Sequence, residues 1–471
     1  MLASGNLDSV FMGGGSQKRQ RWQLEHNRIP RARYIDPEFL RLEYERLFGN
    51  VWQMACRLEE MPVAGDFVEY TIGQESILVV NAGEGKVRAF YNTCAHRGMR
   101  LVSGRGHLTE IRCPFHAWCY DLKGQCTYVH EAEDFGPDFS IEKIQLADCH
   151  VDTWGGWVFV HLGANPPPLR EWLSPVAEAL DPFEPERMRY RWFKSTIMPV
   201  NWKTATDAFI EAYHVGGTHP QNTRRDRLDH GPADLEELRR APLTRSFDAG
   251  VHSRFLHGVR PGAGGTQTSR VANARDVEGF ATLIEYHAAH LLALATKHDV
   301  RAARRLRKTE LPEGQTAFAA FQELRREEAE AAGIVWPVLD DEQFRAGQGN
   351  WHFFPNMVGL FEPGCALGYR IRPNGDDVDS CLFEVWTLEL PPEGEEDAVR
   401  EPEIIEDWRE HDGWGLLLPQ DFTNFPAMTA GMHSRGFTHI RINPLQESAI
   451  MHAHQTADRF LFDDDDTEEN S

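Results

Sequence analysis

Two short pairs of metal-binding residues constrain this chain more than any other feature. Each pair joins one cysteine to one histidine: one residue separates Cys94 from His96, and two separate Cys113 from His116. A stretch of 16 residues lies between the two pairs. Because each pair fits on one tight loop, two facing loops can present two thiolates on one side and two imidazoles on the other. The sequence therefore predicts a small domain built around a bound metal centre.

This set of ligands fits two kinds of metal centre. In a Rieske [2Fe–2S] cluster, one iron binds both cysteines and the other binds both histidines. A structural zinc site can use the same four side chains in a tetrahedron. Zinc fingers, however, usually place Cys beside Cys and His beside His, whereas each pair here is mixed. The order of the ligands therefore favours the iron–sulfur cluster, and with it the transfer of single electrons.

A second group of possible ligands lies further along the chain. It contains two acidic residues, Asp207 and Glu211, and two histidines, His214 and His219. Helical spacing would place Asp207, Glu211 and His214 on one face of a helix, which the following Gly-Gly pair would allow to end. Two histidines near a carboxylate are the ligands of a non-haem Fe(II) site that leaves positions open for oxygen. On its own, such a histidine pair could equally be structural.

The residues around both motifs resemble the large subunits of ring-hydroxylating Rieske oxygenases. The runs 89–98 (AFYNTCAHRG) and 113–118 (CPFHAW) are similar to the two cluster loops of that family, and 201–220 is similar to its iron-binding segment. The resemblance implies an α+β fold. An N-terminal Rieske β domain would be followed by a helix-grip catalytic domain, in which helices pack on an antiparallel sheet.

The same resemblance implies the metal ligands. It assigns the two mixed pairs to a Rieske [2Fe–2S] cluster, and His214 and His219 to a mononuclear Fe(II). In the family the carboxylate ligand lies far downstream after a glutamine, and Asp421 matches that position here. As a lone residue, Asp421 could instead be a surface helix cap. His452 and His454 could also bind metal, but the resemblance gives them no such role.

Asp207 and Glu211 are implied to act in the reaction without binding metal. In the family, the carboxylate at the position of Glu211 links a cluster histidine of a neighbouring subunit to an iron ligand of its own subunit. Here those residues would be His116 and His214, so Glu211 would be an electron bridge. Many members have Asp at this place, and the short spacing from Asp207 resembles the branch that carries Glu. The alternative is that Glu211 only orients His214.

The substrate pocket is implied only by position relative to the ligands. Ala208, Phe209, Asn356 and Leu417 lie where the family lines its pockets, and a place in the core is the alternative for each. Small and apolar groups there favour a hydrophobic, aromatic or polycyclic substrate. The product could be a cis-diol, a monohydroxylated compound or a dealkylated one. A demethylase or monooxygenase for quaternary ammonium or methoxy compounds shares every ligand, and a pure Rieske electron carrier would lack the second iron.

The length of the chain and its turn-forming segments predict the domain organisation. The 471 residues exceed one ordinary core, so two domains are expected. We expect an N-terminal arm and helix over 1–50, the Rieske domain over 51–165 and the catalytic domain over 166–471. A variable insertion is expected over 222–345, and an acidic solvated tail over 463–469.

Composition and the resemblance together predict the partners. A net charge of −23 argues against binding to nucleic acid. The chain has no apolar run of membrane-spanning length, no signal pattern and no regular cysteine framework, so a cytoplasmic protein is expected. It also lacks a Gly-x-Gly-x-x-Gly nucleotide motif, so electrons are expected from a separate ferredoxin or flavin reductase. The resemblance implies a homotrimer or a multiple of one, in some cases with a small β subunit.

Overall fold

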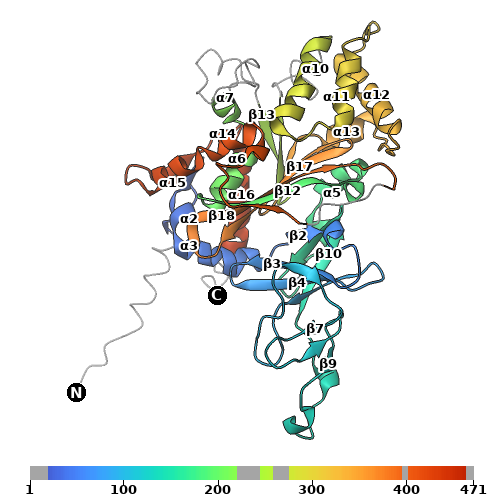
Figure 1. Ribbon diagram of the computed structural model, residues 1–471. Helices are drawn as coiled ribbons and strands as arrows, with labels where there is room; N and C mark the ends of the chain where they lie inside the picture. Colours follow the sequence, from blue (N-terminus) through green and yellow to red (C-terminus); the bar gives the residue numbers. More distant parts are fainter. Residues whose placement is uncertain (1–19, 220–243, 258–274, 395–400, 463–471) are drawn as a thin grey trace, which may run out of the picture.

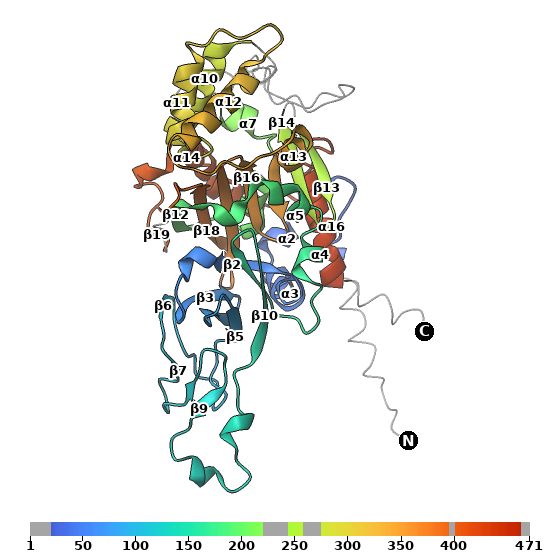
Figure 2. The ribbon, with the colours of Figure 1, turned by 90° about the vertical axis from the view of Figure 1, so that its right-hand side faces the viewer.

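The computed structural model describes residues 20–219, 244–257, 275–394 and 401–462. Within these ranges the chain forms an elongated α+β molecule, in which an N-terminal β domain projects from a larger domain of sheet and helices (Figures 1 and 2). The predicted N-terminal arm, part of the predicted insertion and the acidic tail lie outside the described residues.

The N-terminal domain is built on a seven-stranded antiparallel sheet with the order β2-β11-β10-β5-β4-β3-β6. Its strands are β2 (Gln53–Arg57), β3 (Asp66–Ile72), β4 (Glu75–Asn81), β5 (Val87–Tyr91), β6 (Arg105–His107), β10 (Asp148–Trp154) and β11 (Trp157–His161). A separate three-stranded sheet of β7 (Ile111–Arg112), β8 (Cys119–Tyr120) and β9 (Cys126–Tyr128) lies towards the far end of the domain (Figure 2).

Strand β4 separates two hydrophobic cores. Its successive side chains point to opposite faces of the sheet, as in any β-strand. Ile77 and Val79 join the large core that includes the catalytic domain, whereas Leu78 and Val80 join the core around the two metal-binding loops. The continuous apolar run of this strand therefore serves two buried faces.

The larger domain is built on an eight-stranded sheet with the order β13-β14-β15-β16-β17-β18-β12-β19. Its strands are β12 (Arg189–Met198), β13 (Thr244–Ala249), β14 (His252–His257), β15 (Asn350–Phe353), β16 (Met357–Glu362), β17 (Cys365–Asn374), β18 (Asp377–Glu389) and β19 (Glu403–Ile405). All neighbouring pairs are antiparallel except β12 and β19, which are parallel. Strands β13 and β14 come from within the segment 222–345, so part of that segment belongs to the main sheet.

Helices cover this sheet and carry the residues of interest. They are α2 (Ala32–Ile35), α3 (Pro37–Leu42), η1 (Glu43–Phe48), α4 (Leu169–Trp172), α5 (Val176–Leu180), α6 (Trp202–Phe209), α7 (Val215–Thr218), α13 (Asp341–Gly347), α14 (Leu417–Phe422), α15 (Phe425–His433) and α16 (Ser448–Phe462). Helix α6 packs on β16, β17 and β18, and α16 packs on β13 and β14. A short antiparallel pair of β1 (Arg28–Pro30) and β20 (His439–Arg441) joins the two ends of the described chain.

Three further helices form a separate group at the end of the molecule opposite β7–β9 (Figure 1). They are α10 (Val277–Tyr286), which continues into the π-helical turn η8 (His287–Leu291), α11 (Lys297–Leu306) and α12 (Ala317–Glu330). They share a small core of their own that includes Phe280, Leu306 and Phe321.

Arg370 of β17 ties the two sheets together. Its guanidinium donates to both carboxylate oxygens of Glu384 on β18, at 2.6 and 2.7 Å, and to the backbone carbonyls of Met54 and Ala55 on β2. Burial opposes the charged form of Glu384, but Arg370 and Arg372 outweigh it and lower the pKa of that carboxyl to about 2. The N-terminal domain is therefore fixed to the catalytic sheet by hydrogen bonds from the guanidinium of a buried ion pair.

Candidate metal centres

The two mixed Cys-His pairs lie on two loops with the same backbone pattern. In the first, the N–H of Gly98 donates to the carbonyl of Cys94 at 2.9 Å, and the N–H of Cys94 donates to Met99. In the second, Ala117 donates to Cys113 at 3.1 Å, and Cys113 donates to Trp118. Gly98 and Ala117 both have positive φ angles, 71° and 57°. Each loop thus curls around its own cysteine, which places one thiol and one imidazole side by side.

The side chains on these loops are those that a [2Fe–2S] cluster needs. The rings of His96 and His116 lie 4.7 Å apart, and Trp118 stacks on His96 at 4.6 Å. Both Nδ1 atoms are buried and lack a hydrogen-bond partner within the described ranges. Buried nitrogens are normally paired, so two unpaired Nδ1 atoms beside two buried thiols fit a bound metal centre.

Tyr120 supports the cluster loops from the adjacent strand β8. Its hydroxyl lies 3.3 Å from Sγ of Cys94 and accepts a hydrogen bond from the N–H of Ala95 at 3.1 Å. Burial raises the pKa of the Cys94 thiol, so the thiolate needs compensation from hydrogen bonds and from iron. No sequence pattern indicated this role of Tyr120.

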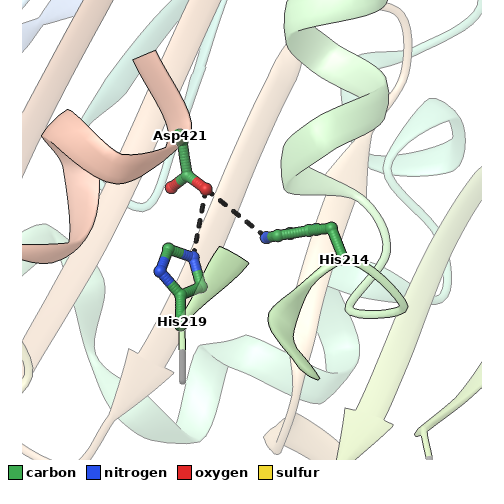
Figure 3. Close-up of side chains that lie close together, drawn as sticks. All are labelled: His214, His219 and Asp421. Atoms are coloured by element: carbon green, nitrogen blue, oxygen red, sulfur yellow. Dashed lines mark ion pairs between the residues drawn. The ribbon is translucent and has the colours of Figure 1, made fainter. Parts of the chain in front are cut away.

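The second ligand set converges from two separate segments (Figure 3). His214 immediately precedes α7, His219 immediately follows it, and Asp421 lies on α14. Oδ1 of Asp421 is 3.0 Å from Nε2 of His219 and 3.6 Å from Nε2 of His214. One ligand atom from each of the three residues lies within 4.8 Å of the others, and among the described residues no other trio of metal-binding side chains does so. This is the geometry of a 2-His-1-carboxylate iron site.

A side-chain oxygen faces the Nδ1 atom of each histidine in this trio. Oε1 of Glu211 lies 2.5 Å from Nδ1 of His214, and Oε1 of Gln420 lies 2.8 Å from Nδ1 of His219. An Nδ1–H that donates to each oxygen leaves the Nε2 lone pair free for iron. Burial disfavours the charged His214 ring, but Glu211 and then Asp421 outweigh it and raise its pKa to about 9.

The predicted helix through Glu211 and His214 is wrong. Helix α6 ends at Phe209, and the carboxylate of Glu211 accepts hydrogen bonds from the backbone N–H groups of Tyr213 and His214. Those N–H groups would bond to carbonyls if the helix continued, so the Glu211 side chain replaces it with a turn. The Gly-Gly pair lies inside α7 and not at a helix end.

Asp207 is partly buried on α6 and does not belong to the group of three ligands. Its Oδ2 accepts a hydrogen bond of 2.7 Å from the Tyr34 hydroxyl, and burial raises its pKa to about 7. The same hydroxyl lies 2.8 Å from Nε2 of His454. His452 instead faces Asp248 at 3.6 Å. Neither histidine belongs to a group of three possible ligands within the described ranges.

The four predicted pocket residues lie in different environments. Phe209 stacks on Tyr369 with ring centroids 4.4 Å apart, and the buried amide of Asn356 donates to the carbonyl of Ile371 at 3.0 Å. Ala208 and Leu417 are partly buried. Their contribution to a substrate pocket stays a prediction.

Two further observations bear on the setting of these sites. None of the described helices has the length and apolar character needed to cross a lipid bilayer. All eight cysteines are buried and free of disulfide bonds.

Comparison with protein families gives two matches. A Rieske [2Fe-2S] domain matches residues 51–141, and the catalytic domain of a ring hydroxylating alpha subunit matches residues 177–462. Each metal site described above lies within one of these ranges.

Three curated relatives are about equally similar in sequence. The glycine betaine monooxygenase oxygenase subunit of Pseudomonas aeruginosa is 31% identical over 194 residues, which cover 41% of this chain and 45% of the relative. The carnitine monooxygenase oxygenase subunit of Escherichia coli is 31% identical over 245 residues, covering 48% and 65%. The biphenyl 2,3-dioxygenase subunit alpha of Rhodococcus jostii is 30% identical over 220 residues, covering 45% and 47%. The aligned part of the chain therefore spans less than two thirds of each relative.

Two solved structures share the fold over nearly the whole chain. A quaternary ammonium Rieske monooxygenase in complex with L-carnitine has a TM-score of 0.59 at 17% identity, covering 92% of this chain and 95% of that one. A naphthalene 1,2-dioxygenase with bound indole has a TM-score of 0.61 at 16% identity, covering 93% of each chain. The catalytic-domain match takes in more than half of the sequence, and both expected ligand sets are assembled in space. The chain belongs to the alpha subunits of the Rieske non-haem iron ring-hydroxylating oxygenases.

Proposed function

We propose that this protein is the oxygenase subunit of a Rieske monooxygenase that inserts oxygen from O2 into an organic substrate. The observation that carries this proposal is the presence of two complete ligand sets in one chain, one for a [2Fe–2S] cluster and one for iron. When bound, the cluster supplies single electrons and the Fe(II) supplies the site of oxygen chemistry. A pure electron carrier has no use for the second set.

The surrounding residues prepare the iron site. Glu211 and Gln420 hold the two ligand rings in the tautomer that offers Nε2. Asp421 offers a buried carboxylate to the same point. With three protein ligands in place, the remaining positions stay open for oxygen beside the substrate.

For the substrate we propose a quaternary ammonium compound, in place of the aromatic or polycyclic compound that the predicted pocket residues favour. The glycine betaine and carnitine monooxygenase subunits support this class, although a biphenyl dioxygenase is similar over a comparable length. Charge supports it as well, because Glu211 and Glu447 both act on the charge of His214. Negative charge close to the iron site favours a cationic head group over a neutral hydrocarbon.

Measurement of oxygen uptake tests both the proposed oxygenase activity and the proposed substrate class. Protein loaded with both metals and supplied with a reductase would be offered glycine betaine, carnitine, biphenyl and naphthalene in separate reactions with labelled O2. We expect labelled product from an ammonium compound, and none from the Asp421→Ala control. Turnover of the hydrocarbons alone would reject the ammonium class, and no product from any compound would reject the oxygenase.

We propose that electrons pass between subunits of a homotrimer or a multiple of one. The β7–β9 end of the N-terminal domain lies at the opposite end of the molecule from α7 and α14 (Figure 1). Exposed apolar side chains surround the cluster loops, including Met99, Phe115 and Phe135, which are 41%, 56% and 47% exposed. Such a patch marks a contact surface, and a closed ring would give every cluster a neighbouring iron.

The electron bridge, the donor and the location complete the proposal. Glu211 would contact His116 of the neighbouring subunit while it holds His214. A ferredoxin or flavin reductase would reduce the cluster, and a small β subunit would be an addition to the ring. The buried free thiols fit a reducing compartment such as the cytoplasm.

A further inference from the structure

The group of helices α10–α12 meets the iron-binding helix α14 at the π-helical turn η8. The backbone carbonyl of His290, within η8, accepts a hydrogen bond of 2.6 Å from the N–H of Leu416, the N-cap residue of α14. Residues of η8 and α14 are also in contact (Figure 2). Single π-helical turns often lie at functional sites, and this one touches the helix that carries Gln420 and Asp421.

Gly415 allows the two backbones to come this close. A Cβ atom at this position would collide with the carbonyl oxygen of His290. The φ of 74° and ψ of −153° at Gly415 also belong to a region that is essentially restricted to glycine. Both the available space and the backbone conformation therefore require glycine here.

Two side chains of β12 hold the segment that follows η8. Nε1 of Trp192 donates to the carbonyl of Leu292 at 3.0 Å, and Nη1 of Arg191 donates to that of Ala295 at 3.3 Å. The register of β12 against β18 shifts at Arg191, as at a β-bulge, which redirects side chains. We call residues 290–295 the strap, because they connect the main sheet to the start of α14.

The strap has an unusual backbone conformation. Leu292 and Leu294 have φ angles of 59° and 58°, in the left-handed region that leucine rarely adopts. Such conformations persist only where surrounding contacts enforce them. The hydrogen bonds from Trp192 and Arg191 are contacts of this kind, and they fix the shape of the strap. The carbonyl of His290 therefore has a defined position.

Helix α14 depends on contacts at its two ends. It has six residues and no side-chain cap at its N-terminus, and a helix this short is not stable by itself. At its C-terminal end, Phe422 is buried against the rings of Trp408 and Trp414. At the other end, the carbonyl of His290 holds the backbone of Leu416. The two residues of α14 that contact His219 lie between these anchors.

We propose that the strap positions the carboxylate ligand of the iron site, with Gly415 and Trp192 as its positioning residues. This inference rests on the proposed function, because it takes Asp421 as a ligand of Fe(II). The strap holds the start of α14 and so sets where Asp421 lies relative to His214 and His219. Gly415 and Trp192 bind no metal and act through the backbone of α14. Part of the predicted variable insertion thereby contributes to the iron site.

Fe(II) affinity tests the role of Gly415. The full-length protein, with its Rieske cluster intact and its mononuclear iron removed, would be titrated with Fe(II). Gly415→Ala should bind Fe(II) about 10-fold more weakly than wild type, because the added Cβ pushes the start of α14 away from the strap. Gly314→Ala is the matched control, since Gly314 has a similar φ of 82° but an added Cβ would meet no described residue within 4 Å. The control should bind Fe(II) as wild type does.

A milder variant keeps the test decisive if Gly415→Ala does not fold. Trp192→Phe removes the indole N–H that donates to Leu292 and keeps an aromatic ring, so Fe(II) binding should weaken about 3- to 10-fold. Trp351→Phe is its matched control. The Trp351 indole also donates to a backbone carbonyl, that of Gly347, at 2.9 Å, and a cationic side chain lies over each of the two indole rings. Trp351 belongs to a different hydrophobic core from α14.

Hydrogen exchange in the same iron-free proteins separates positioning from a general loss of stability. The amides of residues 416–422 should exchange faster in both strap variants than in their controls, while the strands of the main sheet stay protected. A variant that only lowered overall stability would speed exchange throughout the domain. It would also leave the Fe(II) affinity of the folded protein unchanged.

Two results would overturn the proposal. One is equal Fe(II) affinity in Gly415→Ala and Gly314→Ala, and the other is equal affinity in Trp192→Phe and Trp351→Phe. Asp421→Ala tests the underlying proposed function separately, because wild-type affinity in that variant would show that the ligand assignment is wrong. These measurements use no organic compound, so rejection of the proposed substrate class would leave the role of the strap standing.

Discussion

The side-chain oxygen of Gln420 lies 2.8 Å from Nδ1 of His219, on the edge of the ring away from the proposed iron. The next residue, Asp421, faces Nε2 of the same ring at 3.0 Å. Two successive residues of α14 therefore fix one imidazole from opposite sides. One sets its tautomer, and the other shares its metal.

This relationship predicts the effect of removing the amide. Gln420→Leu should weaken iron binding about 10- to 100-fold, because the Nδ1–H of His219 would lose its acceptor and the ring its fixed tautomer. Gln420→Glu is the matched control, since it keeps an oxygen in place. Titration of the iron-free protein with Fe(II) measures both variants, and equal affinity in all three proteins would contradict the assignment.

Removal of the carboxylate ligand should separate the two metals. Asp421→Ala is expected to lose the mononuclear iron and to keep the visible and paramagnetic resonance spectra of the Rieske cluster, because no cluster ligand lies near α14. Iron analysis with both spectra checks this. Loss of the cluster signal from well-folded protein would refute the partition.

Iron binding should depend on pH through His214. Because its pKa is raised to about 9, Fe(II) must displace a proton from this ring below that pH, and binding should strengthen as pH rises towards 9. Glu211→Gln removes the carboxylate that raises this pKa, so the same rise should occur at lower pH. Binding curves across pH for the two proteins provide the comparison.

The same variant tests the electron bridge. Glu211→Gln should keep both metals, yet cluster oxidation during a single turnover should slow greatly. An amide offers one acceptor oxygen and turns an NH2 group towards the imidazole donors. Near-normal product yield and cluster oxidation would mean that Glu211 only orients His214.

The buried pair of Arg370 and Glu384 should make the protein sensitive to acid. The pKa of Glu384 is about 2 in the folded state, against a usual value of 4.5. A lowered pKa contributes stability that is present above pH 4.5 and is lost as the pH falls towards 2, and the shift corresponds to about 3 kcal/mol. Denaturant unfolding at several pH values measures this loss. Glu384→Gln should be less stable at neutral pH and should lack this component of the pH dependence.

Metal ligands that lie close together in the sequence could be predicted from the sequence alone. The mixed order of Cys94, His96, Cys113 and His116 distinguishes an iron–sulfur cluster from zinc without any fold. His214 and His219 are close in sequence, so their pairing was predictable, whereas Asp421 was identified only through the resemblance.

Two kinds of feature could not be predicted: a turn in which a side chain replaces helical hydrogen bonds, and contacts between residues far apart in the sequence. The turn at Glu211 ends a helix that the spacing predicts to continue, because a carboxylate takes the backbone N–H groups. The contact of Tyr34 with Asp207 joins residues 173 positions apart, and no local pattern predicts it. Gln420 was noticed as a marker for Asp421, but its hydrogen bond to His219 needed the three-dimensional structure.

The two-sided packing of β4 has a consequence for how the molecule can be divided. A fragment cut at the predicted boundary would keep Leu78 and Val80 buried around the cluster, but Ile77 and Val79 would lose the catalytic-domain side chains that share their core. Such a fragment would self-associate through its exposed apolar surface and would not behave as a free electron carrier. Strand β4 therefore joins the domain that would carry the electrons to the catalytic domain that would use them. The two domains would unfold as one cooperative unit.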